Sequence, residues 1–108
     1  MVDFNDIEQV GQIDGVKAYI LVNEKGKIIF QNIEAPEKMA HMISVCLKNA
    51  FAIAKNRLKY IYFPLPTKND IYIFPVGRFG LGVVKHQKIS NMVFVQKIIQ
   101  FLNKLVHP

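Results

Sequence analysis

Residues 58–85 read LKYIYFPL-PTKND-IYIFPV-GRFG-LGVVK, so that three apolar runs alternate with two turn clusters. The runs are rich in aromatic and β-branched residues, which favour strands. The clusters between them contain Pro, Asn, Asp and Gly, which favour turns. The segment therefore predicts a hairpin followed by a further strand, at residues 58–65, 71–76 and 81–85.

The first of these strands presents an edge problem. Residues 60–65 are hydrophobic, and Pro64 and Pro75 each lack a ladder donor, which places them near strand ends or at an edge. A hydrophobic strand at the border of a sheet leaves backbone groups free, and proteins resolve this by pairing the edge with another chain. We expect such pairing here.

A helix and a hairpin are predicted upstream. Phe4, Ile7 and Val10 recur every three residues, which indicates a short amphipathic helix over residues 3–13. Residues 16–22 are almost continuously apolar, as expected of a strand in the middle of a sheet. A turn at 23–26 then leads into a return strand at 27–33.

A long helix is predicted from Pro36 to about Asn56, because proline favours the first turn of a helix. Its polar positions are Glu37, His41, Ser44, Lys48 and Lys55. With Ala40 and Phe51, its apolar arc spans about 180°, whereas a helix on one sheet needs an apolar stripe of about 100° or somewhat more. Part of the arc therefore requires a second partner, either a neighbouring helix or the same helix of another subunit. The other apolar positions are Met39, Met42, Ile43, Cys46, Leu47, Ala50, Ile53 and Ala54.

A last helix begins after Ser90, a favourable N-cap, and carries an apolar face. The predicted order is helix, two strands, helix, three strands, helix. No linker or repeat interrupts the 108 residues, so we expect one α+β domain over residues 1–108, with helices covering an antiparallel sheet. The apolar face of the last helix comprises Val95, Ile98, Ile99, Leu102, Leu105 and Val106.

The charge of +6 is unevenly distributed. Residues 1–15 carry four acids and no Lys or Arg, whereas the chain from Lys38 onward has eleven bases and only one acid, Asp70. This basic region can attract an acidic partner, although Lys is also simply the common surface residue of this chain. A nucleic-acid reader would more often use Arg, and only two of the fourteen bases are Arg.

The sequence predicts no catalytic apparatus. The histidines have no carboxylate or cysteine at metal-ligand spacing, and His41 and Cys46, about 140° apart on the helix, do not build a Cys-His nucleophile. The glycine run at 77–82 leads into a strand rather than a helix, unlike a phosphate loop, so we expect Gly77 and Gly80 to form a tight turn and Gly82 to allow a close approach. We therefore predict a non-enzymatic protein without metal or cofactor.

The order and texture of the segments resemble the roadblock family of dynein light chains and their prokaryotic MglB-like relatives. The resemblance rests on the run IDGV at 13–16 leading into 18–22, the hairpin NEKGKII at 23–29, the helix from Pro36, and IYIFPVG at 71–77 followed by LGVV at 81–84. It implies a profilin-like sandwich with a five-stranded antiparallel sheet, the middle helix on one face and the two terminal helices on the other.

The resemblance also implies a function. Such domains dimerise by pairing the third strand and packing the middle helices, and they bind small Ras-like GTPases as regulators, scaffolds or, in MglB-like members, GTPase-activating partners. No arginine finger can be carried over to Arg57 or Arg78. The wide helical arc and the hydrophobic edge independently favour a dimer, either with itself or with a paralogue. We expect the dimer interface to include Met42, Cys46, Ile53, Tyr60, Ile61 and Tyr62, and an acidic partner to meet His41, Lys48 and Lys55.

Two alternative functions remain open. The tyrosines at 60, 62 and 72, with lysines nearby, could form a stacking platform for single-stranded nucleic acid, or the basic region could bind a membrane surface. The sheet could also carry a small-molecule sensor site. The single cysteine, the short apolar runs and the acidic N-terminal residues favour a cytoplasmic protein.

Overall fold

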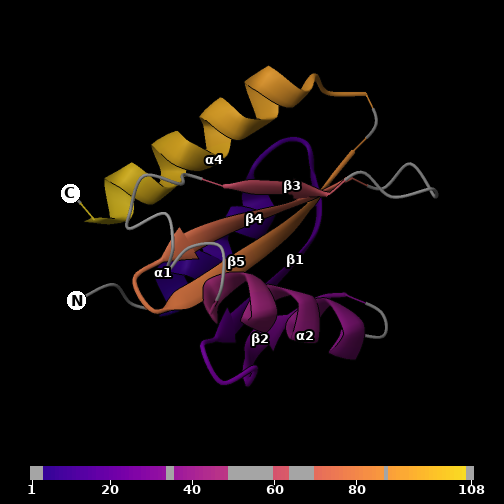
Figure 1. Cartoon of the computed structure of the whole chain (residues 1–108). Helices are drawn as coiled ribbons and strands as arrows, with labels where there is room; N and C mark the ends of the chain where they lie inside the picture. The colour runs from indigo at the N-terminus through magenta and orange to yellow at the C-terminus, as the bar shows by residue number, and fades with distance from the viewer. Residues whose placement is uncertain (1–3, 34–35, 49–59, 64–69, 87, 107–108) are drawn as a thin grey trace.

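The computed structural model describes residues 4–33, 36–48, 60–63, 70–86 and 88–106, and the elements follow the predicted order (Figure 1). Strand Ile71–Val76 has the predicted bounds, and Val16–Asn23 exceeds them by one residue. The elements are α1 (Phe4–Glu8), a 3-10 turn η1 (Gln9–Gln12), β1 (Val16–Asn23), β2 (Ile28–Gln31), α2 (Glu37–Cys46), β3 (Ile61–Phe63), β4 (Ile71–Val76), β5 (Phe79–Lys85) and α4 (Asn91–Val106).

The five strands form one antiparallel sheet in the order β2-β1-β5-β4-β3. β1 lies between β2 and β5, as its continuous apolar sequence predicted. β2 and β3 form the two edges, so the described part of the predicted hydrophobic strand, Ile61–Phe63, lies at a border of the sheet.

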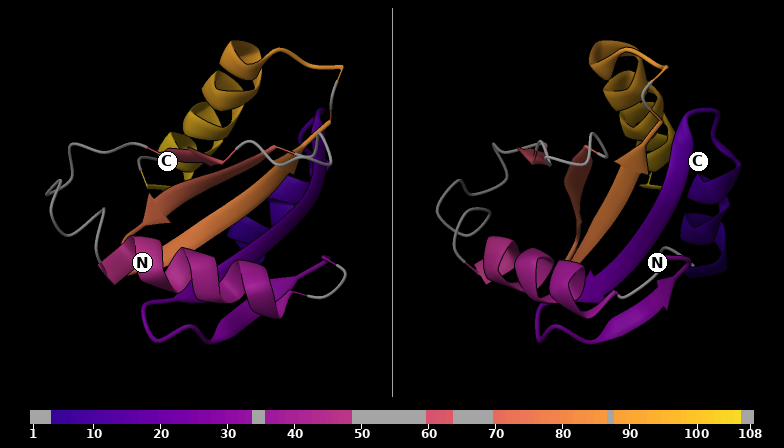
Figure 2. Two further views of the ribbon diagram at one scale, coloured as in Figure 1. Left: turned by 45° about the vertical axis from the view of Figure 1, so that its right-hand side comes forward. Right: turned by 90° about the vertical axis from the view of Figure 1, so that its right-hand side faces the viewer.

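The helices divide between the two faces of the sheet, and this confirms the predicted sandwich (Figure 2). Tyr72 and Phe74 of β4 point to the face that α1, η1 and α4 cover, whereas Ile71 and Ile73 point to the face that α2 covers. Side chains alternate along a strand, so one sequence supplies both cores. Phe94 of α4, which the predicted apolar face did not include, is wholly buried in the first of these cores.

Two local predictions need correction, and a third falls outside the described residues. The first helix is shorter than expected, because a 3-10 turn follows Glu8. Ser44 is buried rather than on the polar face of α2, because the β1–β2 turn packs over it and the Ser44 hydroxyl donates a hydrogen bond to the Glu24 carbonyl at 3.3 Å. The predicted continuation of this helix to Asn56, with Ile53 and Lys55, lies outside the described residues, as do the ends of the strand expected at 58–65.

The glycine run at 77–82 is structural, but Gly80 has a different role from the one expected. Gly77 forms the β4–β5 turn with a φ of 61°. Gly80 and Gly82 both lie within β5 beneath α2, where a Cβ on Gly80 would collide with Ile43 and one on Gly82 would lie 2.8 Å from Ile43 Cδ1. Both glycines therefore let α2 approach the sheet closely.

No helix in the described part of the chain is both long and apolar enough to cross a bilayer.

Candidate functional site

The hydrogen-bonding direction of β4 can be read from Asp70, the residue directly before the strand. The Lys85 backbone N–H donates to the Asp70 carbonyl at 3.1 Å, so Asp70 directs its backbone groups towards β5. Because this direction alternates along an antiparallel strand, Ile71, Ile73 and Pro75 direct theirs towards β3. Pro75 can therefore occupy an interior strand without breaking the ladder with β5, since its missing N–H lies on the other side.

The same alternation defines the open edge of β3. Ile71 pairs with Phe63 and Ile73 pairs with Ile61, and both pairs are of the hydrogen-bonded type. Tyr62 lies between them in the opposite phase, so its N–H and C=O point away from β4. The outward-facing backbone groups of the described β3 strand are therefore those of Tyr62.

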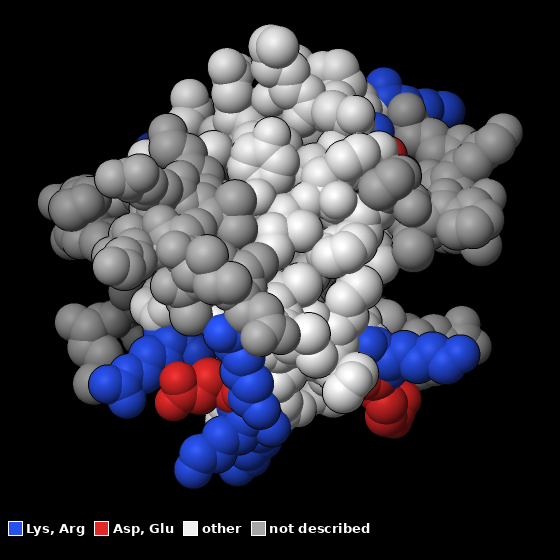
Figure 3. Space-filling view, in the orientation of Figure 1, with Lys and Arg blue, Asp and Glu red and all other residues white. Residues whose placement is uncertain are grey.

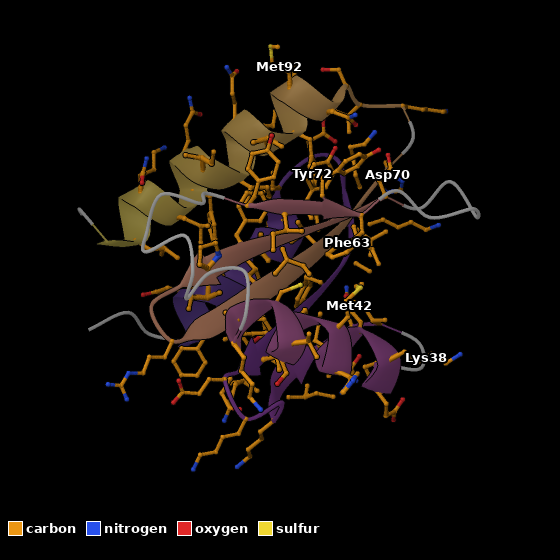
Figure 4. All side chains as sticks on the ribbon, viewed as in Figure 1. Lys38, Met42, Phe63, Asp70, Tyr72 and Met92 are labelled. Carbon is orange, nitrogen blue, oxygen red and sulfur yellow. The ribbon has the colours of Figure 1, made fainter. Side chains whose placement is uncertain are left out.

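The side chains of β3 alternate between the two faces of the sheet. Ile61 and Phe63 are half-buried on the α2 face, together with Met42 (Figure 4). Figure 4 shows Met42 and Phe63 in the space between α2 and β3. Tyr60 and Tyr62 lie on the α4 face instead, where both rings contact Tyr72.

Few charged side chains of the described residues lie over this edge. Figure 3 shows an uncharged band over β3 between α4 and α2, whereas most of the visible Lys, Arg, Asp and Glu side chains of the described residues gather below α2 and β2. A strand edge whose described neighbours include partly exposed apolar side chains has the character of a protein interface.

The edge at β2 is different. Leu21 pairs with Phe30 and Val22 with Ile28, so Ile29 is the extra residue of a β-bulge. The ladder continues through the Asn32 side chain, whose Oδ1 accepts a hydrogen bond from the Tyr19 N–H at 2.7 Å. A bulge twists and shortens an edge, which discourages pairing with another strand. Of the two edges, the described part of β3 is the more open.

The structure brings together three of the residues expected at a dimer interface, Met42, Cys46 and Ile61, on the α2 side of the sheet. Cys46 lies beneath the others at 9% exposure, and burial raises the pKa of its thiol, which disfavours a thiolate nucleophile. Tyr60 and Tyr62 are on the opposite face.

The described residues expected to meet an acidic partner lie on the outer side of α2. His41 and Lys48 are both exposed. Val45 lies close to them in the helical repeat and is 42% exposed, an apolar surface position that the sequence interpretation missed. Within the described chain, no group of three or more His, Cys, Asp or Glu side chains could hold a metal ion.

Asp70 was also missed. The Tyr62 hydroxyl donates a hydrogen bond to Asp70 Oδ2 at 3.0 Å. Tyr72 lies beside Tyr62. Burial raises the pKa of Tyr72 to about 12, with further contributions from the nearby Tyr62, Asp70 and Tyr60. The one signal in the sequence was that Asp70 is the sole acid after residue 38.

The fold of this chain is the one that roadblock domains and profilins share, as the sequence resemblance predicted. Three solved structures illustrate the match. They are MglB of Myxococcus xanthus (19% identity, TM-score 0.68, 83% of this chain and 80% of that one), a Roadblock/LC7 domain from Streptomyces avermitilis (10%, 0.71, 97% and 94%) and profilin IB of Acanthamoeba castellanii (14%, 0.64, 97% and 93%). No family model and no curated protein matches the sequence.

Proposed function

We propose that this chain forms a homodimer through β3 and α2 and that the dimer binds a small Ras-like GTPase as a non-enzymatic regulator or scaffold. The open β3 edge carries the proposal. Two copies related by a twofold axis would pair Tyr62 backbone groups, and Met42, Ile61 and Phe63 of both copies would meet on the α2 side. This arrangement would use an edge with which no described strand pairs, and it would cover the partly exposed apolar side chains there.

The GTPase part of the proposal is supported by the resemblance to the roadblock family and by the fold shared with MglB of Myxococcus xanthus. In the dimer, two α2 helices would lie side by side and present His41 and Lys48 from both copies on one face. This paired face would be basic and could attract the acidic surface of a partner.

Molar mass in solution tests the dimer. Light scattering should give about twice 12.4 kDa for the unaltered protein. Ile61→Lys would place a charge at the interface and should give a monomer. Ile28→Lys is a matched control, because Ile28 is also half-buried on the α2 side but lies on the opposite edge. A monomeric unaltered protein, or an Ile61→Lys variant that stays dimeric, would refute the proposed interface.

Binding to a panel of small Ras-like GTPases, each loaded with GDP or with a GTP analogue, tests the partner. Lys48→Glu should weaken binding, whereas Lys104→Glu, an exposed change on α4, should not. Hydrolysis rates would separate a GTPase-activating partner from a scaffold. Failure to bind any GTPase, together with salt-sensitive binding to unrelated DNA or to acidic vesicles, would favour the alternatives based on the basic region.

A further inference from the structure

A group of hydrogen-bond acceptors lies where β3 and β4 meet the first turn of α4. Asp70 accepts the hydrogen bond from the Tyr62 hydroxyl through Oδ2. An ionised carboxylate offers about four lone-pair positions, so Asp70 has acceptor capacity beyond this bond.

The Tyr72 hydroxyl is buried beside this group without a hydrogen-bond partner. Tyr72 is 2% exposed, and its ring packs against Tyr60, Tyr62 and Phe94 at centroid distances of 6.0, 4.9 and 5.2 Å. A buried hydroxyl without a partner costs about 1–3 kcal/mol. The fold therefore maintains an unfavourable polar atom next to the sole acid of residues 38–108.

We propose that Tyr62, Asp70 and Tyr72 form a binding site for a guanidinium group, supplied by an arginine side chain of a protein partner. The rings of Tyr62 and Tyr72 are too close to admit a ligand between them. The guanidinium would bind at the hydroxyl end of the cluster and donate N–H groups to Asp70, and a shift of the Tyr62 side chain would open the buried Tyr72 oxygen to the same group.

The chemistry of the cluster favours guanidinium over other cations. Its planar fork carries five donors and can bind a carboxylate and a second acceptor together, whereas an ammonium group is a compact point charge. The tyrosine rings add negative π-faces, which guanidinium contacts more often than ammonium does. The oxygen of the Tyr72 hydroxyl carries lone pairs and can accept a hydrogen bond from an N–H group.

The position of the cluster favours a protein as the source of the arginine. Tyr62 is 39% exposed and its hydroxyl meets Asp70 on the α4 side of the sheet, so a partner segment on this side would reach Asp70. Tyrosine and arginine are both enriched at protein interfaces. This site does not require the proposed dimer or a GTPase.

N-acetylarginine amide and N-acetylcitrulline amide provide the test, since citrulline keeps the shape of arginine but lacks its charge. Titration would be followed by NMR of ring-labelled tyrosines in the whole protein. We expect saturable shifts of Tyr62 and Tyr72 with the arginine compound and binding about tenfold weaker or more with citrulline. Tyr19 is an internal control, because it lies on β1 rather than on β3 or β4, and it should not shift.

Two variants and one further compound complete the test. Asp70→Asn and Tyr72→Phe should each weaken arginine binding several-fold, whereas Asp14→Asn, which changes an exposed acid elsewhere, should not. N-acetyllysine amide should bind more weakly than arginine. Equal binding of citrulline, an equal response of Tyr19, unchanged binding by both variants, or lysine binding as tightly as arginine would overturn the proposal. An arginine-containing peptide that binds no better than free arginine amide would exclude a protein source.

Discussion

Tyr62 and Tyr72 face each other across the β3–β4 ladder in a pair whose backbones are not hydrogen-bonded to each other, and their ring centroids are 4.9 Å apart. Such pairs bring side chains closer than hydrogen-bonded pairs do. The same geometry turns the Tyr62 backbone outwards and holds its hydroxyl against Asp70. The open edge and the aromatic cluster therefore share one residue.

Replacing Tyr72 with phenylalanine should leave the free protein as stable as before, or more stable by about 1 kcal/mol. The change removes an unpartnered buried hydroxyl and keeps the ring. Tyr62→Phe is the matched comparison, since it removes a hydrogen bond to Asp70 and should cost about 0.5–1.5 kcal/mol. Urea unfolding measures both. A clear loss of stability in Tyr72→Phe would mean that its hydroxyl has a partner in solution.

Alkaline pH should destabilise the protein through Tyr72. Its pKa is about 12 in the folded chain and about 10 when unfolded, so between these values the native state holds more protons than the unfolded state. The stabilisation is complete below pH 10 and is lost as the pH rises towards 12. Lysines titrate in the same range, so urea unfolding should be compared with Tyr72→Phe. A stability curve equally steep in the variant would contradict the assignment.

Gly82→Ala should destabilise the fold by about 1–3 kcal/mol, because the added methyl group would crowd Ile43 Cδ1 and Ile20 Cγ2 in a packed core. The change Ile43→Val removes the Cδ1 atom. The double variant should therefore recover part of the loss, giving a favourable coupling energy in a double-mutant cycle. Additive effects of the two changes would show that α2 does not constrain Gly82 as described.

Lys85→Met should cost about 1–3 kcal/mol. The Lys85 ammonium is nearly buried and donates to the carbonyls of Ile89 at 2.8 Å and His86 at 3.3 Å, which ties the end of β5 to the segment before α4. Methionine keeps the apolar stem and leaves these carbonyls without their donor. Lys88→Met, at an exposed neighbouring position, should change stability by less than about 0.5 kcal/mol. Equal effects of the two changes would contradict the structural role of Lys85.

The strands and their order along the chain were predictable because local signals agreed. In β4, an aromatic and β-branched run lies between two turn clusters, and its predicted bounds match Ile71–Val76. The position of β1 followed from its continuous apolar sequence, because a strand between two neighbours is covered on both faces. The resemblance then supplied the assignment of helices to faces, which the two cores confirm.

Contacts between distant segments were not predictable. A helical wheel places Ser44 opposite the apolar arc, but it contains no information about the β1–β2 turn that covers this serine. The spacing of the glycines at 77–82 suggested a turn at Gly80. The structure shows instead that α2 packs so closely over Gly80 that a side chain there would collide with Ile43. In the sequence, Asp70 is only the last residue of a turn cluster. Its hydrogen bond with Tyr62 depends on the register of β3 and β4, which the sequence does not specify.

The bulge at Ile29 sets a limit on assembly. If two copies join through β3, the two outer strands of the larger sheet are both β2, and each carries the bulge and the Asn32 side-chain link. A third copy then finds no flat strand to extend, so growth stops at two chains. A variant with a regular β2 strand would have two open edges per chain and could polymerise into fibres.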